Sequence, residues 1–196
     1  MKLILPRGVS QGVFGAALAA FERVLGKEHV LATDTDRETY LDLYAPGNEI
    51  THAPSAALVV SSTEQVQEVV RIANQRRIPL WPISRGKNYG YGGSAPAMPG
   101  TVVLDLTRMK RILEVNADLG YCIIEPGVGF FDLHEHLTRN RIPLWMEFRA
   151  TRGGALWATP SSAASAPRRM ASTRQVFAAW RSCCRMESWC ARARGR

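Results

Sequence analysis

The run of residues 84–93 is the part of the chain whose composition points most directly to chemistry. It reads Ser-Arg-Gly-Lys-Asn-Tyr-Gly-Tyr-Gly-Gly, with four glycines in its last eight positions. Glycine adopts backbone angles that other residues resist, so several N–H groups can converge on one anion. Arg85 and Lys87 add positive charge, and no Ser or Thr follows the lysine as a Walker loop requires. The run predicts either a phosphate-binding loop or a glycine-rich turn without a ligand.

Other reactive residue types form weaker patterns. His134 and His136 stand two apart in an expected helix and so point in different directions, and no Cys or second His cluster completes a metal set. Cys122 lies in an apolar strand, where it is expected to be a small buried hydrophobe. The remaining cysteines, Cys183, Cys184 and Cys190, match no zinc spacing. We expect no metal and no disulfide framework, which fits a cytoplasmic protein.

The elements before the loop predict a strand, helix and strand unit. Residues 10–26 predict an amphipathic helix with Ser10 as its cap and Gly26 at its end. Residues 56–60 predict a buried strand, and a second helix opens at Ser62 with Gln65 completing a capping box. Its expected apolar face comprises Val66, Val69, Val70 and Ala73. Two prolines within residues 78–83 favour a strand at a sheet edge, and parallel pairing of the two strands by a right-handed crossover is expected.

The elements after the loop predict a second small sheet. Its expected strands are residues 101–106, 111–116 and 121–125, with a turn at 117–120 between the last two. A turn at 125–128 then leads into a helix over about 130–140. Periodicity therefore predicts two lobes, each of helices and strands, with the glycine-rich loop between them.

Charge and composition change near residue 147. The formal net charge is +8, which would normally indicate an acidic partner such as nucleic acid. Residues 1–146 carry 15 Lys or Arg and 15 Asp or Glu, whereas residues 147–196 carry ten Arg and two Glu. This last stretch has no apolar period, and beyond Trp180 and Trp189 it lacks aromatics interleaved with its arginines for stacking on bases. We therefore expect no nucleic-acid partner.

The apolar residues 12–25 are interrupted by charges and are shorter than the ~20 residues of a membrane span, so no signal peptide and no membrane segment are expected.

Several separate segments together resemble one protein family. Residues 79–93, 103–106 (Val-Leu-Asp-Leu), 111–116 (Arg-Ile-Leu-Glu-Val-Asn) and 125–128 (Glu-Pro-Gly-Val) occur in the order and spacing of the p-cresol methylhydroxylase and vanillyl-alcohol oxidase flavoproteins, which include eugenol hydroxylase. The resemblance runs from about residue 21 to 146. It implies an α+β, two-lobed FAD-binding domain, and some members of this family work in the periplasm. A flavin oxidase for hydroxy acids or sugars is the alternative within this superfamily. The sequence Arg-Gly-Lys-Asn-Tyr-Gly-Tyr-Gly-Gly at residues 85–93 argues against it.

The resemblance also implies roles for named residues. Tyr91 matches a tyrosine that binds the substrate phenolate, with a core tyrosine of the second lobe as the less favoured alternative. A turn at residues 125–128 matches a segment near the flavin, although a tight turn ending a strand would look the same. The family oxidises para-substituted phenols such as 4-cresol, vanillyl alcohol or eugenol by hydride transfer to FAD, with a cytochrome c subunit and homodimerisation as further possible partners. The residues implied for the cofactor are Ser84, Arg85, Gly86, Lys87, Asn88, Tyr89 and Gly90 on its pyrophosphate, and Glu125, Pro126, Gly127 and Val128 near the flavin.

The family pattern stops at residue 147 in a way that the genetic code can explain. Joining the last base of each codon to the first two of the next makes the residues from 156 onward compatible with Leu-Gly-Asn-Thr-Leu-Glu-Arg-Gly-Val-Gly. The same reading of residues 183–192 permits Leu-Pro-Asp-Gly-Val-Leu-Val-Arg-Thr-Gly, and both resemble the family's continuation. Bases fixed by Trp and Met codons fall where glycine or valine is required, at Trp157, Met170, Met186 and Trp189. We infer a one-base frame change near Met146.

The expected organisation is a helical lead-in at 1–50, a partial FAD-binding domain at 51–146 and an out-of-frame, unstructured tail at 147–196. The second lobe is then incomplete, and a substrate-binding cap is missing. We expect the chain as written to have little or no oxidoreductase activity, unlike its full-length parent. A stand-alone module that binds FAD without catalysis remains the alternative.

Overall fold

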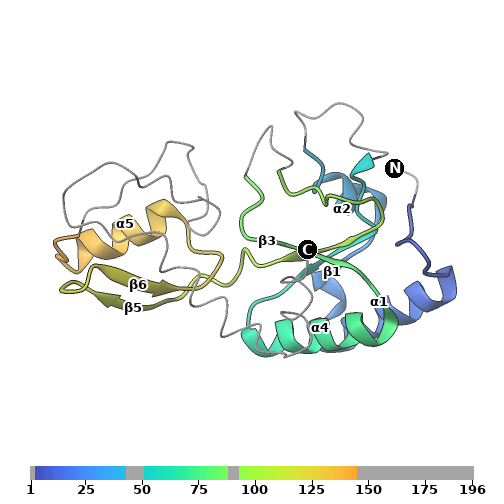
Figure 1. Cartoon of the computed structure of the whole chain (residues 1–196), viewed down its shortest axis with the longest axis horizontal. Coiled ribbons are helices and arrows are strands. Elements are labelled where there is room, and N and C mark those ends of the chain that lie inside the picture. Colours follow the sequence, from blue (N-terminus) through green and yellow to red (C-terminus); the bar gives the residue numbers. More distant parts are fainter. Residues whose placement is uncertain (1–2, 43–50, 88–92, 145–196) are drawn as a thin grey trace, which may run out of the picture. The chain divides into compact units, whose positions relative to one another are not determined.

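A computed structural model describes residues 3–42, 51–87 and 93–144 of the chain. It divides into two compact units, Met1–Met109 and Lys110–Arg196 (Figure 1). The expected tail at 147–196 lies outside the described residues. Each unit has its own buried core, so the two are taken in turn.

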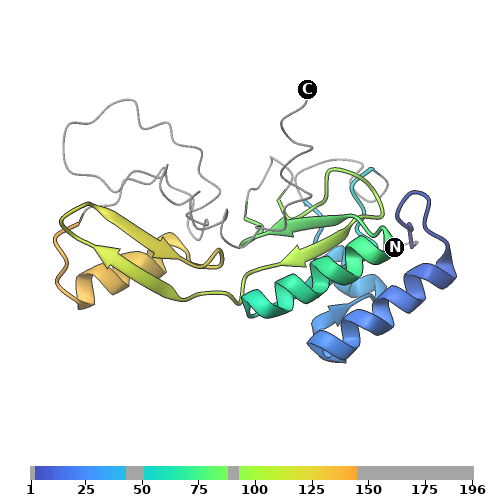
Figure 2. The same ribbon diagram turned by 60° about the horizontal axis from the view of Figure 1, so that its bottom comes forward.

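The first unit contains one four-stranded sheet with helices on its faces. Its order is β1-β2-β4-β3, in which β2, β4 and β3 run parallel and β1 is antiparallel to β2 (Figure 2). In chain order the elements are α1 (Gln11–Leu25), the 3-10 helix η1 (Lys27–His29), β1 (Val30–Leu31), α2 (Asp34–Glu38), β2 (Ala56–Val59), α4 (Thr63–Arg76), β3 (Leu80–Ile83) and β4 (Val102–Asp105).

This topology corrects two expectations about pairing. The strands β2 and β3 are parallel, as predicted, but they do not pair with each other, because β4 lies between them and pairs with both. The strand at 101–106 was expected in the second sheet and instead completes the first. A parallel sheet buried on both faces selects apolar runs rather than an alternating pattern, so the local sequence does not distinguish these sheets. The proline-based prediction is confirmed, since β3, with Pro82, is an edge strand.

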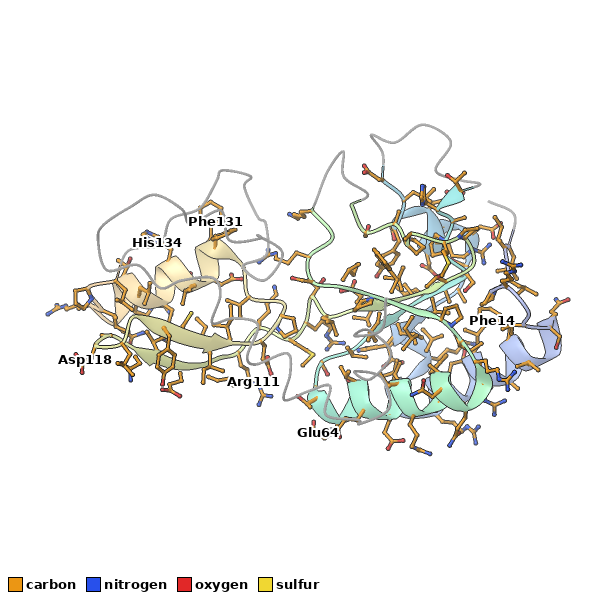
Figure 3. The ribbon with its side chains drawn as sticks, in the orientation of Figure 1. Phe14, Glu64, Arg111, Asp118, Phe131 and His134 are labelled. Carbon is orange, nitrogen blue, oxygen red and sulfur yellow. The ribbon has the colours of Figure 1, made fainter. Side chains whose placement is uncertain are left out.

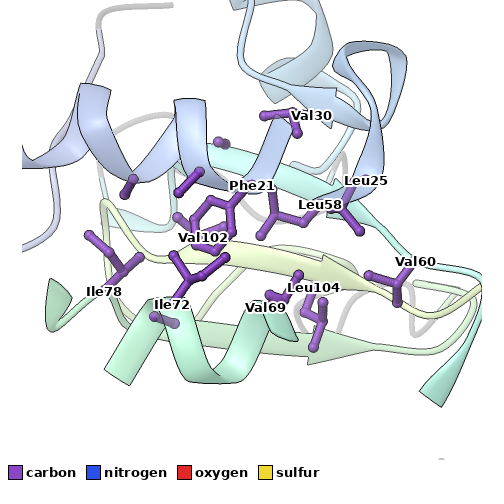
Figure 4. Close-up of a cluster of buried hydrophobic side chains, with 14 of the residues drawn as sticks. Phe21, Leu25, Val30, Leu58, Val60, Val69, Ile72, Ile78, Val102 and Leu104 are labelled. Carbon is purple, nitrogen blue, oxygen red and sulfur yellow. The ribbon is translucent and has the colours of Figure 1, made fainter. Parts of the chain in front are cut away.

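Alternate residues of β2 and β4 belong to two different buried clusters, one on each face of the sheet. Ala56 and Leu58 of β2 and Val102 and Leu104 of β4 pack against α1 and α4 on one face (Figure 4). The residues between them, including Ala57 and Val103, form a separate cluster on the opposite face. Helix α1 supplies Phe14, Ala17, Phe21 and Leu25 to the first cluster, so the N-terminal helix is part of this core.

Helix ends largely follow the sequence signals. The Ser10 hydroxyl accepts a hydrogen bond from the Val13 N–H, and Gly26 ends α1 with φ of 90°. Ser62 caps α4 as expected, but the Gln65 side chain accepts from the N–H of Ser61 rather than that of Ser62, so the capping box is displaced by one residue. The buried face of α4 is Val69, Ile72 and Ala73, and Ile72 takes the place expected for Val70.

The second unit is an antiparallel hairpin with one helix against it. Strands β5 (Ile112–Asn116) and β6 (Tyr121–Ile124) pair across the turn at 117–120, and α5 spans Phe130–Arg139. Ile124, Val128, Phe130, Leu133 and Leu137 form the buried cluster, with the half-buried Cys122 packed against it. These elements match the expected ones within a residue or two. Figure 3 places Phe131 and His134 on α5, and Phe131 is exposed.

In neither unit is any described helix long and apolar enough to cross a bilayer.

Candidate cofactor-binding site

The glycine-rich run leaves the sheet of the first unit at the carboxyl end of β3. Because β2, β3 and β4 are parallel, their carboxyl ends lie along one edge of the sheet, which is where open parallel sheets bind ligands. Ser84, Arg85, Gly86 and Lys87 are placed there directly after Ile83. The remaining predicted residues of the run, Asn88, Tyr89, Gly90 and Tyr91, lie outside the described residues.

The two ends of the run come together at Gly86. Its φ is +61°, and a Cβ atom placed on it would lie 2.8 Å from the Cβ of Ser94. A non-glycine residue would therefore be strained by its backbone angle and would also collide with a buried neighbour. The approach of Ser94 closes the base of a loop spanning residues 87–93, hereafter the glycine-rich loop.

A hydrogen-bonded network supports Ser84, near the N-terminal end of this loop. The Thr107 hydroxyl donates to the carbonyl of the buried Ser84 over 2.6 Å. The Thr107 N–H donates to Asp105 Oδ1 over 2.8 Å, and the Tyr40 hydroxyl donates to Asp105 Oδ2 over 2.8 Å. Burial, reinforced by the charge of Asp105, raises the pKa of Tyr40 far above its ordinary value, so its hydroxyl keeps its proton.

The C-terminal end of the loop, at Gly93, lies near the segment that carries Tyr40. At Gly93, with φ of +54°, an added Cβ would lie 3.4 Å from the Cβ of Asp42. Asp42 is buried and stands two residues after Tyr40. The same short segment thus donates a hydrogen bond to Asp105 from Tyr40 and passes near Gly93 at Asp42.

The charges predicted for the loop are differently exposed. Arg85 is half-buried, whereas Lys87 is exposed to solvent at the loop's start. Two cations within three residues, next to a glycine-rich backbone at the carboxyl edge of a parallel sheet, suit an anion such as a phosphate. The four described residues, Ser84 to Lys87, follow β3 at the edge of the sheet where such a loop is expected, and their binding of a phosphate stays a prediction.

The second predicted group of residues forms a tight turn in the second unit. Glu125 follows β6, and the Val128 N–H donates to its carbonyl over 3.1 Å. The buried Glu125 carboxylate accepts hydrogen bonds of 2.7 Å from the N–H and the Nε of Arg111, and its Oε1 lies 2.7 Å from Arg111 Nη2. Val128 is fully buried among the apolar residues of α5, while Pro126 and Gly127 complete the turn. The Glu125 carboxylate is thus engaged within its own unit, and a cofactor contact of this turn stays a prediction.

Sequence reasoning gave no role to Tyr40, Asp105 or Thr107. Asp105 lies in the Val-Leu-Asp-Leu segment that carries the family resemblance, so the sequence did mark its position. Thr107 follows two residues later. Tyr40 lies 65 residues before its partner, and no local pattern links the two. In the part of the chain that the structure describes, no three His, Cys, Asp or Glu side chains gather as a metal site would require.

Comparison with known proteins identifies the family of this chain. Residues 54–187 match the model of a family described as an FAD binding domain. The chain belongs to this FAD-binding family. The match begins just before β2 and continues past residue 147.

Three relatives narrow the resemblance. The flavoprotein subunit of 4-cresol dehydrogenase (hydroxylating) from Pseudomonas putida is 40% identical over 147 residues, which are 75% of this chain and 28% of the relative. The 1'-carboxy-chondrochloren decarboxylase of Chondromyces crocatus is 42% identical over 121 residues, 62% of this chain and 22% of the relative. The 4-ethylphenol oxidase of Gulosibacter chungangensis, in its isoeugenol complex, superimposes with a TM-score of 0.73 at 38% identity, covering 78% of this chain and 29% of the other.

These similarities confirm the expected resemblance to the p-cresol methylhydroxylase group and the α+β, FAD-binding fold class. The chain spans less than a third of the length of each of these relatives. FAD is the cofactor of this family, and the glycine-rich loop fits it. Gly86 leaves room for the close approach that closes the loop, and Arg85 and Lys87 supply charge opposite to that of a pyrophosphate.

Proposed function

We propose that this chain is the FAD-binding part of an FAD-dependent oxidoreductase that acts on para-substituted phenols. The observation that carries the proposal is the closed glycine-rich loop at the carboxyl edge of a parallel sheet, within a chain 40% identical to a 4-cresol dehydrogenase subunit. In this proposal residues 84–90 hold the pyrophosphate, and the turn at 125–128 lies near the flavin. Bound FAD would supply the acceptor for a hydride.

Cofactor binding is tested by titrating the 196-residue chain with FAD and following flavin fluorescence. Saturable binding is expected, and riboflavin, which lacks the pyrophosphate, is expected to bind more weakly. Gly86→Ala is expected to weaken FAD binding, because its side chain would force Ser94 away and open the loop. Gly15→Ala is the matched control, since an added Cβ in α1 meets no atom within 4 Å. Equal affinity of all three chains for FAD would contradict a role for the loop.

The phenolic substrate rests on the relatives rather than on the described residues. The three relatives are named for a dehydrogenation with hydroxylation, a decarboxylation and an oxidation, at 38% to 42% identity. Similarity in this region therefore accompanies several reactions, and it supports the shared cofactor more strongly than one substrate. We propose that Tyr91 donates a hydrogen bond to the substrate phenolate, where an oxyanion is stabilised by a fixed donor.

We further propose that a one-base frame change near Met146 separates this chain from a longer, active parent. The reading of residues 156–165 and 183–192 in the neighbouring frame supports it. The family match that reaches residue 187 is the observation that competes with it. Resequencing the gene across the codons for Met146 and Glu147 tests the proposal. An intact frame there, with no family-like sequence in the other frames, would refute it.

The activity that follows differs between the two chains. Purified 196-residue chain is expected to turn over no 4-cresol, vanillyl alcohol or eugenol, whereas the frame-restored parent is expected to oxidise at least one of them. Because the Pseudomonas putida relative is a subunit, a cytochrome c subunit is the partner proposed for the parent, together with self-association. Turnover by the short chain would instead show that residues 1–196 contain a complete active site.

The alternative is a stand-alone module that holds FAD without catalysis. The observation that favours it is that the first unit has its own buried core. A flavin spectrum that no phenol bleaches, together with an intact reading frame, would select the module over the broken enzyme.

A further inference from the structure

Arg111 and Glu125 are joined through both their backbones and their side chains. The Glu125 N–H donates to the Arg111 carbonyl over 2.9 Å, and the Arg111 N–H donates to Glu125 Oε2 over 2.7 Å. Arg111 Nε and Nη2 each lie 2.7 Å from Glu125 Oε1. Arg111 therefore binds both oxygens of a buried carboxylate, although its own side chain is largely exposed. Through these contacts it holds the first residue of the turn at 125–128.

The backbone donors of this turn can be followed one by one. The Glu125 N–H is bonded to Arg111, Pro126 has no N–H, and the Val128 N–H donates to the Glu125 carbonyl over 3.1 Å. Gly127 is buried, yet its N–H donates to no residue in the described part of the chain. Buried N–H groups without an acceptor are rare in folded proteins. The turn thus holds one donor that suits a bound ligand.

We propose that Arg111 is a positioning residue, which holds Glu125 so that the turn presents the Gly127 N–H to an acceptor atom of the flavin ring. The link to the flavin rests on the proposed function, whereas the ordering of the turn by Arg111 concerns the chain alone. In this arrangement the Glu125 carboxylate supports the turn and leaves the contact with the cofactor to the backbone.

The geometry favours arginine over lysine at this position. A guanidinium presents several N–H donors in one plane, so Nε and Nη2 of Arg111 can meet the same carboxylate together. A lysine ammonium keeps the charge on a flexible chain but lacks this fixed fork. The bond from the backbone N–H of Arg111 to Glu125 survives either substitution, so Arg111→Lys and Arg111→Gln should loosen the turn in two steps.

Order of the turn is measured first, without cofactor, by hydrogen exchange of the whole chain followed by NMR. The Val128 N–H reports on the turn, and the N–H of the buried Leu137 reports on α5. Arg111→Gln is expected to accelerate exchange at Val128 on the order of tenfold more than at Leu137, and Arg111→Lys about threefold more, because the turn opens locally. Equal acceleration at the two amides would mean a general loss of stability and would overturn the inference.

Arg139 provides a matched control in the same unit. It forms an ion pair with Glu135 in α5, and both side chains are exposed. Arg139→Gln and Arg139→Lys should leave the ratio of exchange at Val128 to exchange at Leu137 unchanged. A change as large as that caused by Arg111→Gln would show that the loss of any arginine loosens the turn, and the inference would fail.

Contact with the flavin is measured second, by titrating the isotope-labelled chain with FAD. The Gly127 N–H signal is expected to move downfield and its exchange to slow on the order of tenfold, because a hydrogen-bonded amide exchanges slowly. Riboflavin, which carries the ring without the pyrophosphate, should move the same signal at higher concentration, whereas ADP, which lacks the ring, should not. Arg111→Gln is expected to weaken FAD binding about threefold, in line with the net strength of a single hydrogen bond.

The two halves of the inference can fail separately. If the unmodified chain binds neither FAD nor riboflavin, the proposed function fails for this chain and the link to the flavin falls with it, while exchange at Val128 still decides whether Arg111 orders the turn. If FAD binds and the Gly127 signal stays unchanged, or if ADP moves it as far as FAD does, the donor does not face the flavin ring and that half is refuted.

Discussion

The two units of this chain obtain a buried core in different ways. In the first, two helices and parallel strands from distant parts of the sequence surround Phe21, Leu58 and Val102, all of which are fully buried. In the second, one hairpin and one helix, adjacent in sequence, enclose a smaller cluster and leave Leu113, Leu119 and Phe131 more than half exposed.

This difference separates what each unit can do. The parallel strands of the first unit bring the loop after β3 next to residues from β4 and from the segment after α2, so distant residues can hold one backbone loop. Local contacts in the second unit produce a tight turn whose acidic side chain is bound by Arg111, the residue before β5. The first unit therefore has the stronger case as the site of phosphate binding.

The comparison is tested most severely by one phenylalanine from each unit. Phe21→Ala is expected to lower the free energy of unfolding by about 3 to 5 kcal/mol, because a fully buried ring is replaced by a cavity. Phe131→Ala, at a side chain 56% exposed, is expected to change it by less than about 1 kcal/mol. Urea denaturation followed by circular dichroism measures both. Similar losses would show that the exposed face of α5 is covered by other parts of the chain.

The closure of the glycine-rich loop predicts the next largest effect. Gly86→Ala is expected to destabilise the first unit by about 2 kcal/mol, since alanine at φ of +61° is strained and its Cβ would meet Ser94. Gly15→Ala in α1 is expected to stabilise by about 0.5 to 1 kcal/mol through helix propensity. Thermal unfolding of the two variants gives the comparison. A neutral Gly86→Ala would show that the loop base is not closed.

The second unit is stabilised by the ion pair between Arg111 and Glu125. Removing this pair is expected to destabilise the chain less than Gly86→Ala does. Arg111→Ala is expected to destabilise this unit by about 1 to 2 kcal/mol, because the buried Glu125 keeps its bond from the backbone N–H but loses its charge partner. Hydrogen exchange of the β5 and β6 amides should accelerate while that of β2 and β4 stays unchanged. Arg139→Ala, in an exposed pair with Glu135, is the control and should have little effect. Equal acceleration in both sheets would mean that the units do not unfold separately.

Alkaline pH should distinguish a tyrosine in each unit. The pKa of Tyr40 is raised in the folded chain, so the folded state holds the proton more tightly than the unfolded state. The stabilisation is present below the unfolded pKa of about 10 and is lost as pH rises above it, by at most about 1.4 kcal/mol per pH unit. Tyr40→Phe should remove this dependence of the free energy of unfolding on pH. Denaturation at several pH values between about 9 and about 11 measures it. The hydrogen bond to Glu114 also raises the pKa of Tyr121, but solvent screens this half-buried side chain, so Tyr121→Phe should change this dependence less than Tyr40→Phe does.

The sequence predicted the helices and strands more accurately than it predicted which strands and side chains contact each other. Helix α1, helix α5 and the β5–β6 hairpin were predicted within a residue or two, because their caps, turns and apolar faces are local. Insertion of β4 between β2 and β3 was missed, since the strand that follows the loop carries no local mark of the sheet it joins. The loop was found through its glycines, whereas Tyr40 and Asp105 were assigned no role because their bond joins residues far apart in sequence.

The edge position of β3 has a further consequence for how copies of this chain meet. A parallel sheet ends in unpaired backbone groups that can accept a strand from another molecule. Here one edge is the two-residue β1, and the other carries Pro82, which lacks an N–H to donate. Both edges are therefore poor templates for intermolecular strand pairing, and the first unit is protected from growth into an extended sheet by the same proline that marked β3 in the sequence.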